Sequence, residues 1–426
     1  MNIDALKKVC VVGWGKSGIA LCTLLRTLGK EVLLTDEKPR ERFASGPINA
    51  FMQRGVRFEF GAHTEQFIKE SQLVVVSPGV DMAQSSAVSI ARACAIPCVG
   101  EVEFSFWLTK AHFVAITGTN GKTTTTFLTY RVLKSRRKRV FLGGNIGIPV
   151  SSFILATKKG DVIVLEISSF QLESIIEFRP FVGCLLNFEP NHLDRHPTVT
   201  DYYNAKMNLF RNQTVRDYAV VNKNIAMRGD IEKRITSRIV YFSDEFPNEN
   251  FSCIYRTATI FGLSKADCVG VFSEFRGLPH RLQLVRDLAG VRFINDSKST
   301  NPSSTMWALQ ALKGDIILIA GGKDKGVDYA VIIPYLKRVK KVNLIGQAAE
   351  KIKQALGGRV PVEIFPSLEA VVRASFGQAR KRDTIVFSPM CSSFDMFLNY
   401  MDRGRKFMAA VNSLSRDNAI ETSQMT

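Results

Sequence analysis

A glycine-containing loop between an apolar run and a helix-forming run constrains the fold of this chain more than any other feature. Residues 113–117 are mostly apolar, GTNG follows at 118–121, and Lys122 and Thr123 come next. The glycines let the backbone curl so that its N–H groups point at phosphate oxygens. The lysine supplies a cation, and the threonine hydroxyl can ligate Mg²⁺. The N-terminus of the following helix favours an anion at the same place.

The spacing of this loop differs from the usual G-x-x-x-x-G-K-[ST] pattern, because Ile116 stands where the first glycine would be. A plain glycine-rich turn between a strand and a helix is the alternative interpretation. The strand, the loop, the Lys-Thr pair and the helix nevertheless come in the required order. We therefore predict a phosphate-binding loop in an α/β domain.

The first hundred residues carry a second glycine motif. A strand is predicted at 9–12, GWGKSG follows at 13–18, a helix runs to about Leu28, and a strand at 31–35 leads to Asp36. This is the G-x-G-x-x-G arrangement of dinucleotide-binding βαβ units, in which the acid binds the ribose. The same arrangement serves other nucleotides, so a dehydrogenase with a nicotinamide cofactor stays open at this point.

The charge balance is strongly basic, with 57 Lys and Arg against 39 Asp and Glu, a net charge of +18. Such a charge suits nucleic acids or polyanionic small substrates, and it also arises from cations at helix ends. The basic runs at 136–139, 337–341 and 380–382 each follow a helical pattern and precede a strand. No aromatic residues interleave with them to stack on bases. We therefore predict no nucleic-acid partner and keep a nucleic-acid-stimulated ATPase only as an alternative.

The eight cysteines are scattered, form no C-x-x-C pair, and mostly lie in apolar runs. This usage is typical of reduced, mostly buried thiols in a cytosolic protein.

The first residues resemble no signal peptide, and no apolar run approaches the length of a membrane span, so no membrane insertion is expected. The length of 426 residues suggests two to four domains. The polar residues from about Leu414 are expected to fray.

Polar clusters follow several predicted strands further along the chain. The apolar strand at 161–167 carries one charge near its end, Glu166, where a carboxylate is a natural Mg²⁺ ligand. The strand at 181–187 leads to NHLDRH at 191–196, and Lys206 lies on a helix just after it. Further clusters are NDSKSTNP at 295–302, GGKDKG at 321–326 and SPMCSSFD at 388–395. Such clusters at successive strand ends predict a site shared between domains.

Five segments resemble the ATP-dependent Mur ligases and folylpolyglutamate synthetases. They are TGTNGKTT at 117–124, EISSFQL at 166–172, GLPHR at 277–281, NDSK at 295–298 and SPMCSSFDMF at 388–397. The EISSFQL and SPMCSSFDMF segments are most similar to the D-glutamate-adding branch of the Mur ligases, and the similarity spans nearly the whole chain. Another Mur ligase or a folylpolyglutamate synthetase-like amide ligase is the alternative.

The resemblance implies an α/β protein of three domains. Residues 1–100 would form a Rossmann-like domain that binds the UDP substrate, 101–278 a central P-loop ATPase-like domain with a parallel sheet, and 279–426 a Rossmann-like C-terminal domain that binds the amino acid. The implied reaction adds D-glutamate to UDP-N-acetylmuramoyl-L-alanine through an acyl phosphate, with ATP and Mg²⁺ at two sites. It serves peptidoglycan precursor synthesis in the bacterial cytoplasm, and we expect a monomer.

The resemblance also implies roles for individual residues. The catalytic group comprises Lys122, Glu166, His192 and Lys206. The metal ligands would be Thr123, Glu166, His192 and Lys206, with Lys206 carrying a CO₂ adduct because a carbamate can ligate a cation and an ammonium cannot. ATP would be bound by Gly118, Thr119, Asn120, Gly121, Lys122, Thr123, Thr124, Thr125, Arg281 and Asp296. The UDP substrate would be bound by Gly13, Trp14, Gly15, Lys16, Ser17, Gly18, Asp36, Asn145 and Ser168. D-Glutamate would be bound by Lys298, Thr300, Lys325, Ser393 and Tyr400.

Three features depart from the family pattern. The His-Asn-x-x-Asn segment near the adenine is here FPNEN at 246–250, which leaves Asn248 or Asn250 for the adenine contact. The stretch after Phe242 is short, as if a β-hairpin were missing. Asn191 replaces the usual acid before His192, so one carboxylate fewer is expected beside the second metal.

Overall fold

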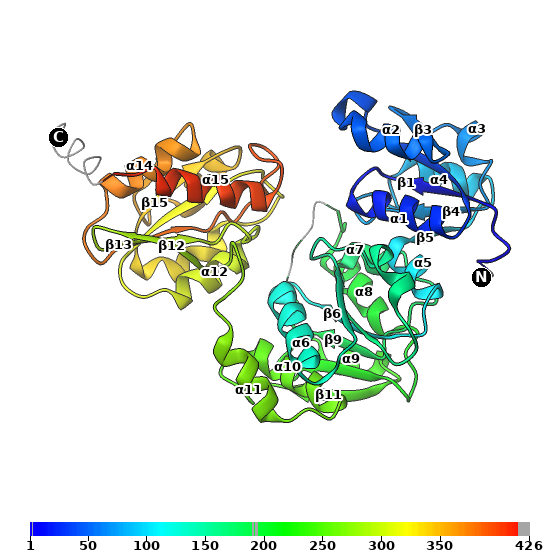
Figure 1. Cartoon of the computed structure of the whole chain (residues 1–426). Coiled ribbons are helices and arrows are strands. Elements are labelled where there is room, and N and C mark those ends of the chain that lie inside the picture. The colour runs from blue at the N-terminus through cyan, green and yellow to red at the C-terminus, as the bar shows by residue number, and fades with distance from the viewer. Residues whose placement is uncertain (2, 190, 192–194, 416–426) are drawn as a thin grey trace. The chain divides into compact units, whose positions relative to one another are not determined.

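The computed structural model describes residues 1, 3–189, 191 and 195–415. The chain forms two compact units, which we describe separately (Figure 1). Unit 1 comprises Met1–Phe188 and Thr200–Glu274, and unit 2 comprises Glu189–Val199 and Phe275–Thr426. His192, Asp194 and the tail after residue 415, all subjects of prediction, lie outside the described residues.

The first sheet of unit 1 has five parallel strands in the order β3-β2-β1-β4-β5. Its strands are β1 (Lys8–Val12), β2 (Glu31–Asp36), β3 (Val56–Phe60), β4 (Leu73–Val76) and β5 (Cys98–Gly100). Its helices are α1 (Lys16–Thr27), η1 (Arg40–Arg42), α2 (Ser45–Gln53), α3 (Glu65–Ile68) and α4 (Ser86–Ala93). The predicted strand–loop–helix–strand unit of the first glycine motif is confirmed as β1, α1 and β2.

Helix α5 (Glu101–Trp107) joins this sheet to the second sheet of unit 1. Two of its carboxylates are buried and accept backbone N–H groups. Glu103 accepts from Ile176, Glu177 and Phe178 at 2.7–2.9 Å, and Glu101 accepts from Ser151 at 2.7 Å. Because a single apolar core also runs through both sheets, the two sheets form one unit.

The second sheet has six parallel strands in the order β11-β10-β9-β6-β8-β7. They are β6 (His112–Thr117), β7 (Val140–Gly144), β8 (Val162–Glu166), β9 (Val182–Leu185), β10 (Tyr218–Asn222) and β11 (Arg238–Phe242). Its helices are α6 (Lys122–Arg136), η2 (Val150–Ser152), η3 (Ile154–Ala156), α7 (Ser169–Glu173), α8 (Val199–Met207), η4 (Asn208–Phe210), α9 (Arg228–Arg234), α10 (Glu249–Ile260) and α11 (Lys265–Glu274). No strand forms between Phe242 and Glu249, as the short sequence there predicts.

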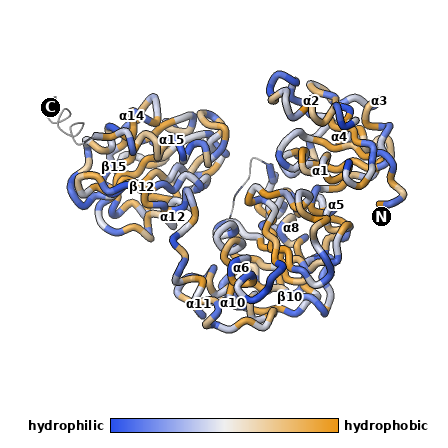
Figure 2. The backbone as a smooth tube through the Cα atoms, in the orientation of Figure 1, coloured by the Kyte–Doolittle hydropathy of each residue, from blue (hydrophilic) through white to orange (hydrophobic). Residues whose placement is uncertain are grey.

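The sheet of unit 2 is mixed, in the order β12-β13-β17-β14-β15-β16, with only β12 antiparallel to its neighbour. The strands are β12 (Gln283–Leu288), β13 (Val291–Asn295), β14 (Ile316–Gly321), β15 (Val339–Ile345), β16 (Val362–Ile364) and β17 (Thr384–Phe387). The helices are α12 (Pro302–Ala311), η5 (Ala330–Arg338), α13 (Ala349–Leu356), α14 (Leu368–Gly377) and α15 (Tyr400–Asn412). Apolar residues run along the strands of each part, as the tube coloured by hydropathy shows (Figure 2).

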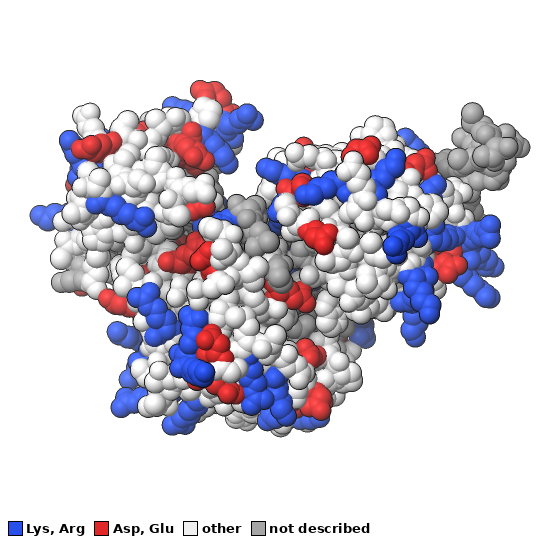
Figure 3. Space-filling model, turned by 180° about the vertical axis from the view of Figure 1, so that it is seen from behind, with Lys and Arg blue, Asp and Glu red and all other residues white. Residues whose placement is uncertain are grey.

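Only some of the basic residues in the predicted runs lie at helix ends. Arg136 ends α6 and Arg338 ends η5, as predicted, but Lys340 and Lys341 lie within β15. There they pair with Asp383 and Glu363, so the helix-end prediction was wrong for these two. On the face drawn in Figure 3, basic side chains stand in several groups with acidic ones among them.

The cysteines are all free in the structure and six of the eight are buried. No helix in the described ranges is long and apolar enough to cross a membrane.

Candidate active site

The loop after β6 lies at the middle of the second sheet, where the chain turns into α6. Gly121 has φ +81°, and a Cβ atom there would approach Asn250 Oδ1 to 2.6 Å, so only glycine fits without rearrangement. Lys122 donates from Nζ to the carbonyl oxygens of Gly118 at 2.7 Å and Thr119 at 2.8 Å. The predicted lysine therefore lies folded over its own loop, at the N-terminus of a 15-residue helix.

Asn187, which follows the neighbouring strand β9, fixes the first half of this loop. Its Oδ1 accepts from the N–H groups of Thr119 at 3.0 Å and Asn120 at 2.8 Å, and its Nδ2 donates to the Asn120 carbonyl at 3.2 Å. The side chain thus satisfies two N–H groups in the first half of the loop. Sequence reasoning treated Asn187 only as the end of a strand, although a polar residue at that point was a usable signal.

Glu166 ends β8, which pairs directly with β6, and it is 1% exposed. Its Oε1 accepts from Asn145 Nδ2 at 2.9 Å, whereas its Oε2 is buried and has no hydrogen-bond partner among the residues that the structure describes. A buried carboxylate oxygen without a partner is costly. This orphaned oxygen lies at the end of the strand next to β6, and the Thr123 hydroxyl lies on the first turn of α6, which follows β6. Both suit a divalent cation, because Mg²⁺ prefers carboxylate and hydroxyl oxygens.

Lys206, on α8, reaches the same loop. Its Nζ donates to the Gly118 carbonyl at 2.9 Å and lies 4.5 Å from the centre of the Tyr202 ring. The side chain is 1% exposed, and no ion pair of Lys206 is found in the described part of the chain. Burial, with a smaller contribution from the nearby Lys122, holds the pKa of Lys206 well below its ordinary value. The amine is therefore readily neutral, which is the form that reacts with electrophiles.

The first glycine motif forms a turn closed by Asp36. The Asp36 carboxylate accepts from the N–H of Trp14 at 2.7 Å and from the N–H of Lys38 at 2.9 Å. Lys16, at the start of α1, lies near the turn at Gly147, since a Cβ atom there would be 3.9 Å from the lysine Nζ. The structure thus brings the 13–18 loop and the 143–147 segment, which carries Asn145, close together within unit 1. Ser168 caps α7 in a capping box with Gln171.

In unit 2, the residues predicted to bind D-glutamate lie on loops and a helix at one edge of the sheet. Lys298, after β13, lies 3.9 Å from the centre of the Tyr400 ring at the start of α15. Ser393 is buried in the loop after β17, and Lys325 lies in the loop after β14. Because β13, β17 and β14 are adjacent and parallel, these loops share one edge. Thr300 follows in the same loop as Lys298.

Asp296, predicted to reach ATP, is buried inside unit 2. Its Oδ2 accepts from Ser299 Oγ at 2.6 Å and Ser388 Oγ at 2.7 Å, and its Oδ1 accepts from the Leu282 N–H at 3.1 Å. The carboxylate therefore links the loops after β13 and β17 to the segment before β12. Burial raises the pKa of Asp296 from its usual 3.8 to about 6, with the hydrogen bonds and Arg281 opposing that shift.

A raised pKa makes the folded state of unit 2 sensitive to pH. The protonated form stabilises the folded state fully below pH 3.8, and this contribution is lost as the pH rises to about 6. Asp296→Asn removes the titration. We expect its unfolding free energy, relative to that of the parent, to rise between pH 4 and pH 6 by up to about 3 kcal/mol and then to level off. Calorimetric unfolding across pH 4–8 checks this, and parallel curves for the two proteins would contradict it.

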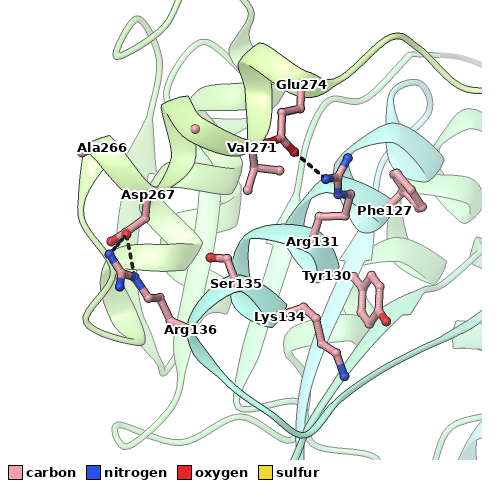
Figure 4. Close-up of a pocket in the computed structure, with 11 residues that line it drawn as sticks. Phe127, Tyr130, Arg131, Lys134, Ser135, Arg136, Ala266, Asp267, Val271 and Glu274 are labelled. Carbon is pink, nitrogen blue, oxygen red and sulfur yellow. Dashed lines mark hydrogen bonds and ion pairs between the residues drawn. The ribbon is translucent and has the colours of Figure 1, made fainter.

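A cleft of about 670 Å³ in unit 1 lies between α6 and α11 (Figure 4). Two ion pairs flank it, Arg131 with Glu274 at 2.9 Å and Arg136 with Asp267 at 2.6 Å. Glu274 is the last residue of unit 1, so the first pair attaches the end of this unit to the helix of the phosphate-binding loop. None of the predicted site residues lines this cleft.

Family models match successive parts of the chain. The model described as "Mur ligase MurD-like, N-terminal domain" matches residues 7–100, "Mur ligase middle domain" matches 116–265, and "Mur ligase, glutamate ligase domain" matches 280–391. Among solved structures, MurF from Acinetobacter baumannii is 14% identical over 89% of this chain and 90% of its own, with a TM-score of 0.62. MurF from Thermotoga maritima in complex with ADP is 14% identical over 93% of this chain and 96% of its own, with a TM-score of 0.61. These likenesses confirm the predicted α/β fold.

Curated relatives are closer in sequence. The UDP-N-acetylmuramoylalanine--D-glutamate ligase of Caldanaerobacter subterraneus subsp. tengcongensis is 37% identical, over 96% of this chain and 99% of its own. The enzyme of the same name from Thermoanaerobacter pseudethanolicus is 38% identical over the same shares. The chain therefore belongs to the UDP-N-acetylmuramoylalanine--D-glutamate ligases of the Mur ligase family.

Proposed function

We propose that this chain is an ATP-dependent ligase that joins D-glutamate to UDP-N-acetylmuramoyl-L-alanine. The observation that carries the proposal is the gathering of a phosphate-binding loop, the orphaned Glu166 oxygen and the buried Lys206 amine at one edge of the second sheet. The relatives that bear the name of this reaction support the choice of substrates. They favour this ligase over another Mur ligase, and over the dehydrogenase and the nucleic-acid-stimulated ATPase.

In the proposed reaction, the alanyl carboxylate attacks the γ-phosphorus of ATP and ADP leaves, which produces an acyl phosphate. The neutral D-glutamate amine then attacks the acyl carbon, inorganic phosphate leaves with the electron pair of the broken C–O bond, and the nitrogen loses one proton, which the phosphate takes up, as the amide forms. Lys122 and the loop N–H groups that Asn187 does not occupy bind the β- and γ-phosphates and stabilise the charge that develops during transfer. The remaining contribution of the protein is to hold the reactants in line.

Thr123 and Glu166 would hold one Mg²⁺, and His192 and Lys206 would hold a second. The metal neutralises phosphate charge when it is bound. The unpartnered, buried Glu166 Oε2 supports the first site, and Asn145 keeps the carboxylate oriented through its other oxygen.

Lys206 would serve the second metal as a carbamate. Carbamate formation requires a neutral amine, which attacks CO₂ and then loses a proton. The burial of Lys206 and its depressed pKa favour this reaction over retention of an ammonium. The resulting carbamate is an anion with oxygen ligands, and a buried site next to Mg²⁺ would stabilise it.

The remaining site residues follow the same proposal. Residues 1–100 bind the UDP moiety through the 13–18 loop and Asp36, residues 101–278 bind ATP, and residues 279–426 bind D-glutamate. Asn145 and Ser168 face the muramoyl substrate, and Arg281 and Asp296 assist ATP binding. Asn248 accepts the N–H of Asn250 as the cap of α10, whereas the Asn250 side chain lies against Gly121. We therefore assign the adenine-side contact to Asn250. We further propose a cytoplasmic monomer that contributes to peptidoglycan precursor synthesis.

The Glu166→Gln variant tests whether Glu166 binds the metal, separately from its effect on the stability of the fold. We expect the variant to lose ligation while its thermal midpoint in a chelator stays equal to that of the parent or rises, because an uncompensated buried charge is removed. Addition of Mg²⁺ should raise the midpoint of the parent and not that of the variant. Thermal scans with and without Mg²⁺ check this. An equal Mg²⁺ shift in both proteins would remove Glu166 from the metal site.

The proposed substrates are tested by ATP turnover with UDP-N-acetylmuramoyl-L-alanine and each of D-glutamate, L-glutamate, L-alanine and L-lysine. We expect D-glutamate alone to give rapid ADP release and a UDP-linked product of higher mass. A product with another amino acid and none with D-glutamate would assign the chain to a different ligase.

A further inference from the structure

Arg403 is fully buried in unit 2, at 0% exposure, on the first turn of α15. No ion pair of Arg403 occurs within the residues that the structure describes, and an isolated buried guanidinium is costly unless its N–H groups are bonded. Burial lowers the pKa of Arg403 to about 10, with Cys391, Asp395 and Asp296 opposing that shift, so the side chain stays cationic at neutral pH. A residue held under such conditions needs a structural or functional reason.

The guanidinium joins two loops through four hydrogen bonds. Its Nε donates to Ser297 Oγ at 3.0 Å and its Nη2 to the Ser297 carbonyl at 2.8 Å. Its Nη1 donates to the carbonyl oxygens of Cys391 at 3.0 Å and Ser392 at 3.1 Å. Only the planar fork of arginine presents donors in several fixed directions at once. Arg403 therefore ties the loop after β13 to the loop after β17.

The same contacts extend to a third loop and to α15. The Ser392 carbonyl also accepts from the Lys323 N–H at 2.9 Å, in the loop after β14. A Cβ atom on Gly322 of that loop would lie 3.2 Å from the Arg403 Nη1, so the backbone passes close to the guanidinium. The Ser297 hydroxyl, which accepts from Arg403, donates to the Tyr400 carbonyl at 2.9 Å.

Each of these segments carries a residue of the proposed D-glutamate pocket. Lys298 and Thr300 follow Ser297, Ser393 follows Ser392, Lys325 follows Lys323 by two positions, and Tyr400 begins α15. We propose that Arg403 is the positioning residue of this pocket, which fixes the three strand-end loops and Tyr400 in one arrangement for the amino-acid substrate. The inference rests on the proposed function, because the pocket is assigned there.

The test compares Arg403→Met and Arg403→Lys with a matched control, Arg286→Met. Arg286 also bonds backbone carbonyls at α15, but at the other end of the helix, at Val411, Asn412 and Leu414. We expect both Arg403 variants to raise the KM for D-glutamate about tenfold or more, with the KM for ATP and for the UDP substrate within about twofold of the parent. Arg403→Lys keeps the charge but cannot reach both loops. Arg286→Met should change no KM, even where it lowers the thermal midpoint.

A second variant covers the case in which Arg403→Met does not fold. Ser297→Ala removes only the hydroxyl between Arg403 and Tyr400, and we expect a smaller rise in the same KM. Parental D-glutamate KM in Arg403→Lys and in Ser297→Ala would overturn the proposal, as would equal changes in all three KM values.

Hydrogen exchange makes this test independent of the proposed reaction. Amides at 296–300 and 390–395 should exchange faster in Arg403→Lys than in the parent, and they should be unaffected in Arg286→Met. A parent that fails to ligate D-glutamate, combined with this exchange result, would refute the proposed function and leave the positioning of the loops intact. Unchanged exchange in Arg403→Lys would refute the positioning role itself.

Discussion

Lys122→Ala is expected to abolish ligation while the protein stays folded. A preorganised donor aimed at a charge that develops in the transition state contributes about 3–4 kcal/mol, so turnover should fall about 10²–10³-fold or more. The structural loss is limited, because among the described residues the half-buried ammonium gives up hydrogen bonds to the carbonyls of Gly118 and Thr119. A hydrogen bond from a charged donor stabilises a fold by about 1.5–3 kcal/mol, and the partial exposure of this ammonium to water lowers that contribution.

The matched control for this variant is Lys134→Ala on the same helix. Lys134 is exposed and donates to the Lys138 carbonyl at the far end of α6. We expect parental kcat in Lys134→Ala and a near-zero kcat in Lys122→Ala, with similar circular dichroism and thermal midpoints in both. Near-normal turnover by a folded Lys122→Ala protein would remove the loop lysine from the mechanism.

Lys206→Ala is expected to be almost inactive and to be rescued in part by a short carboxylic acid. The loss should be at least about 100-fold, because a ligand of the second metal disappears. Acetate or propionate added in solution fits the space that the side chain vacates and restores an anionic oxygen near Gly118. Activity as a function of added carboxylate measures the rescue. A merely structural lysine would give no rescue.

Two controls sharpen this experiment. Lys206→Met keeps the stem of the side chain, so no space opens and carboxylates should not restore its activity. Lys122→Ala lacks a cation rather than an anion and should not respond to carboxylates either. Full activity of Lys206→Ala, or an unmodified amine found by mass analysis of active, metal-loaded enzyme, would refute the carbamate.

The elements that carry short local signals could be predicted from the sequence. The loop at 118–121, the helix that begins at Lys122 and the apolar strand that ends at Glu166 appear in the structure within two residues of the expected bounds. Their patterns are local, since a glycine at positive φ and an apolar run need no knowledge of distant residues. The position of Lys16 near Gly147, by contrast, depends on how two sheets pack and had no local signal.

The order of the strands in each sheet, and the residues that hold the site residues in place, could not be predicted from local sequence patterns. Strand β6 lies between β8 and β9, although β7 comes directly after it in the chain. Lys340 and Lys341 resemble helix-end cations in the sequence, but they lie in β15, which pairs with β14 and β16. Arg403 is one of two arginines in α15, and only its burial against Ser297 and Ser392 distinguishes it from a solvated arginine. Residues such as these act through tertiary contacts, which a local sequence pattern does not show.

The central claim, that this chain forms an amide with D-glutamate through an acyl phosphate, is tested most directly by isotope transfer. UDP-N-acetylmuramoyl-L-alanine labelled with oxygen-18 in its alanyl carboxylate is incubated with ATP, Mg²⁺, D-glutamate and the enzyme, and the products are analysed by mass spectrometry. We predict a UDP-linked product that contains D-glutamate, together with inorganic phosphate that carries one oxygen-18 atom. The absence of the D-glutamate product, or its formation with unlabelled phosphate, would contradict the account.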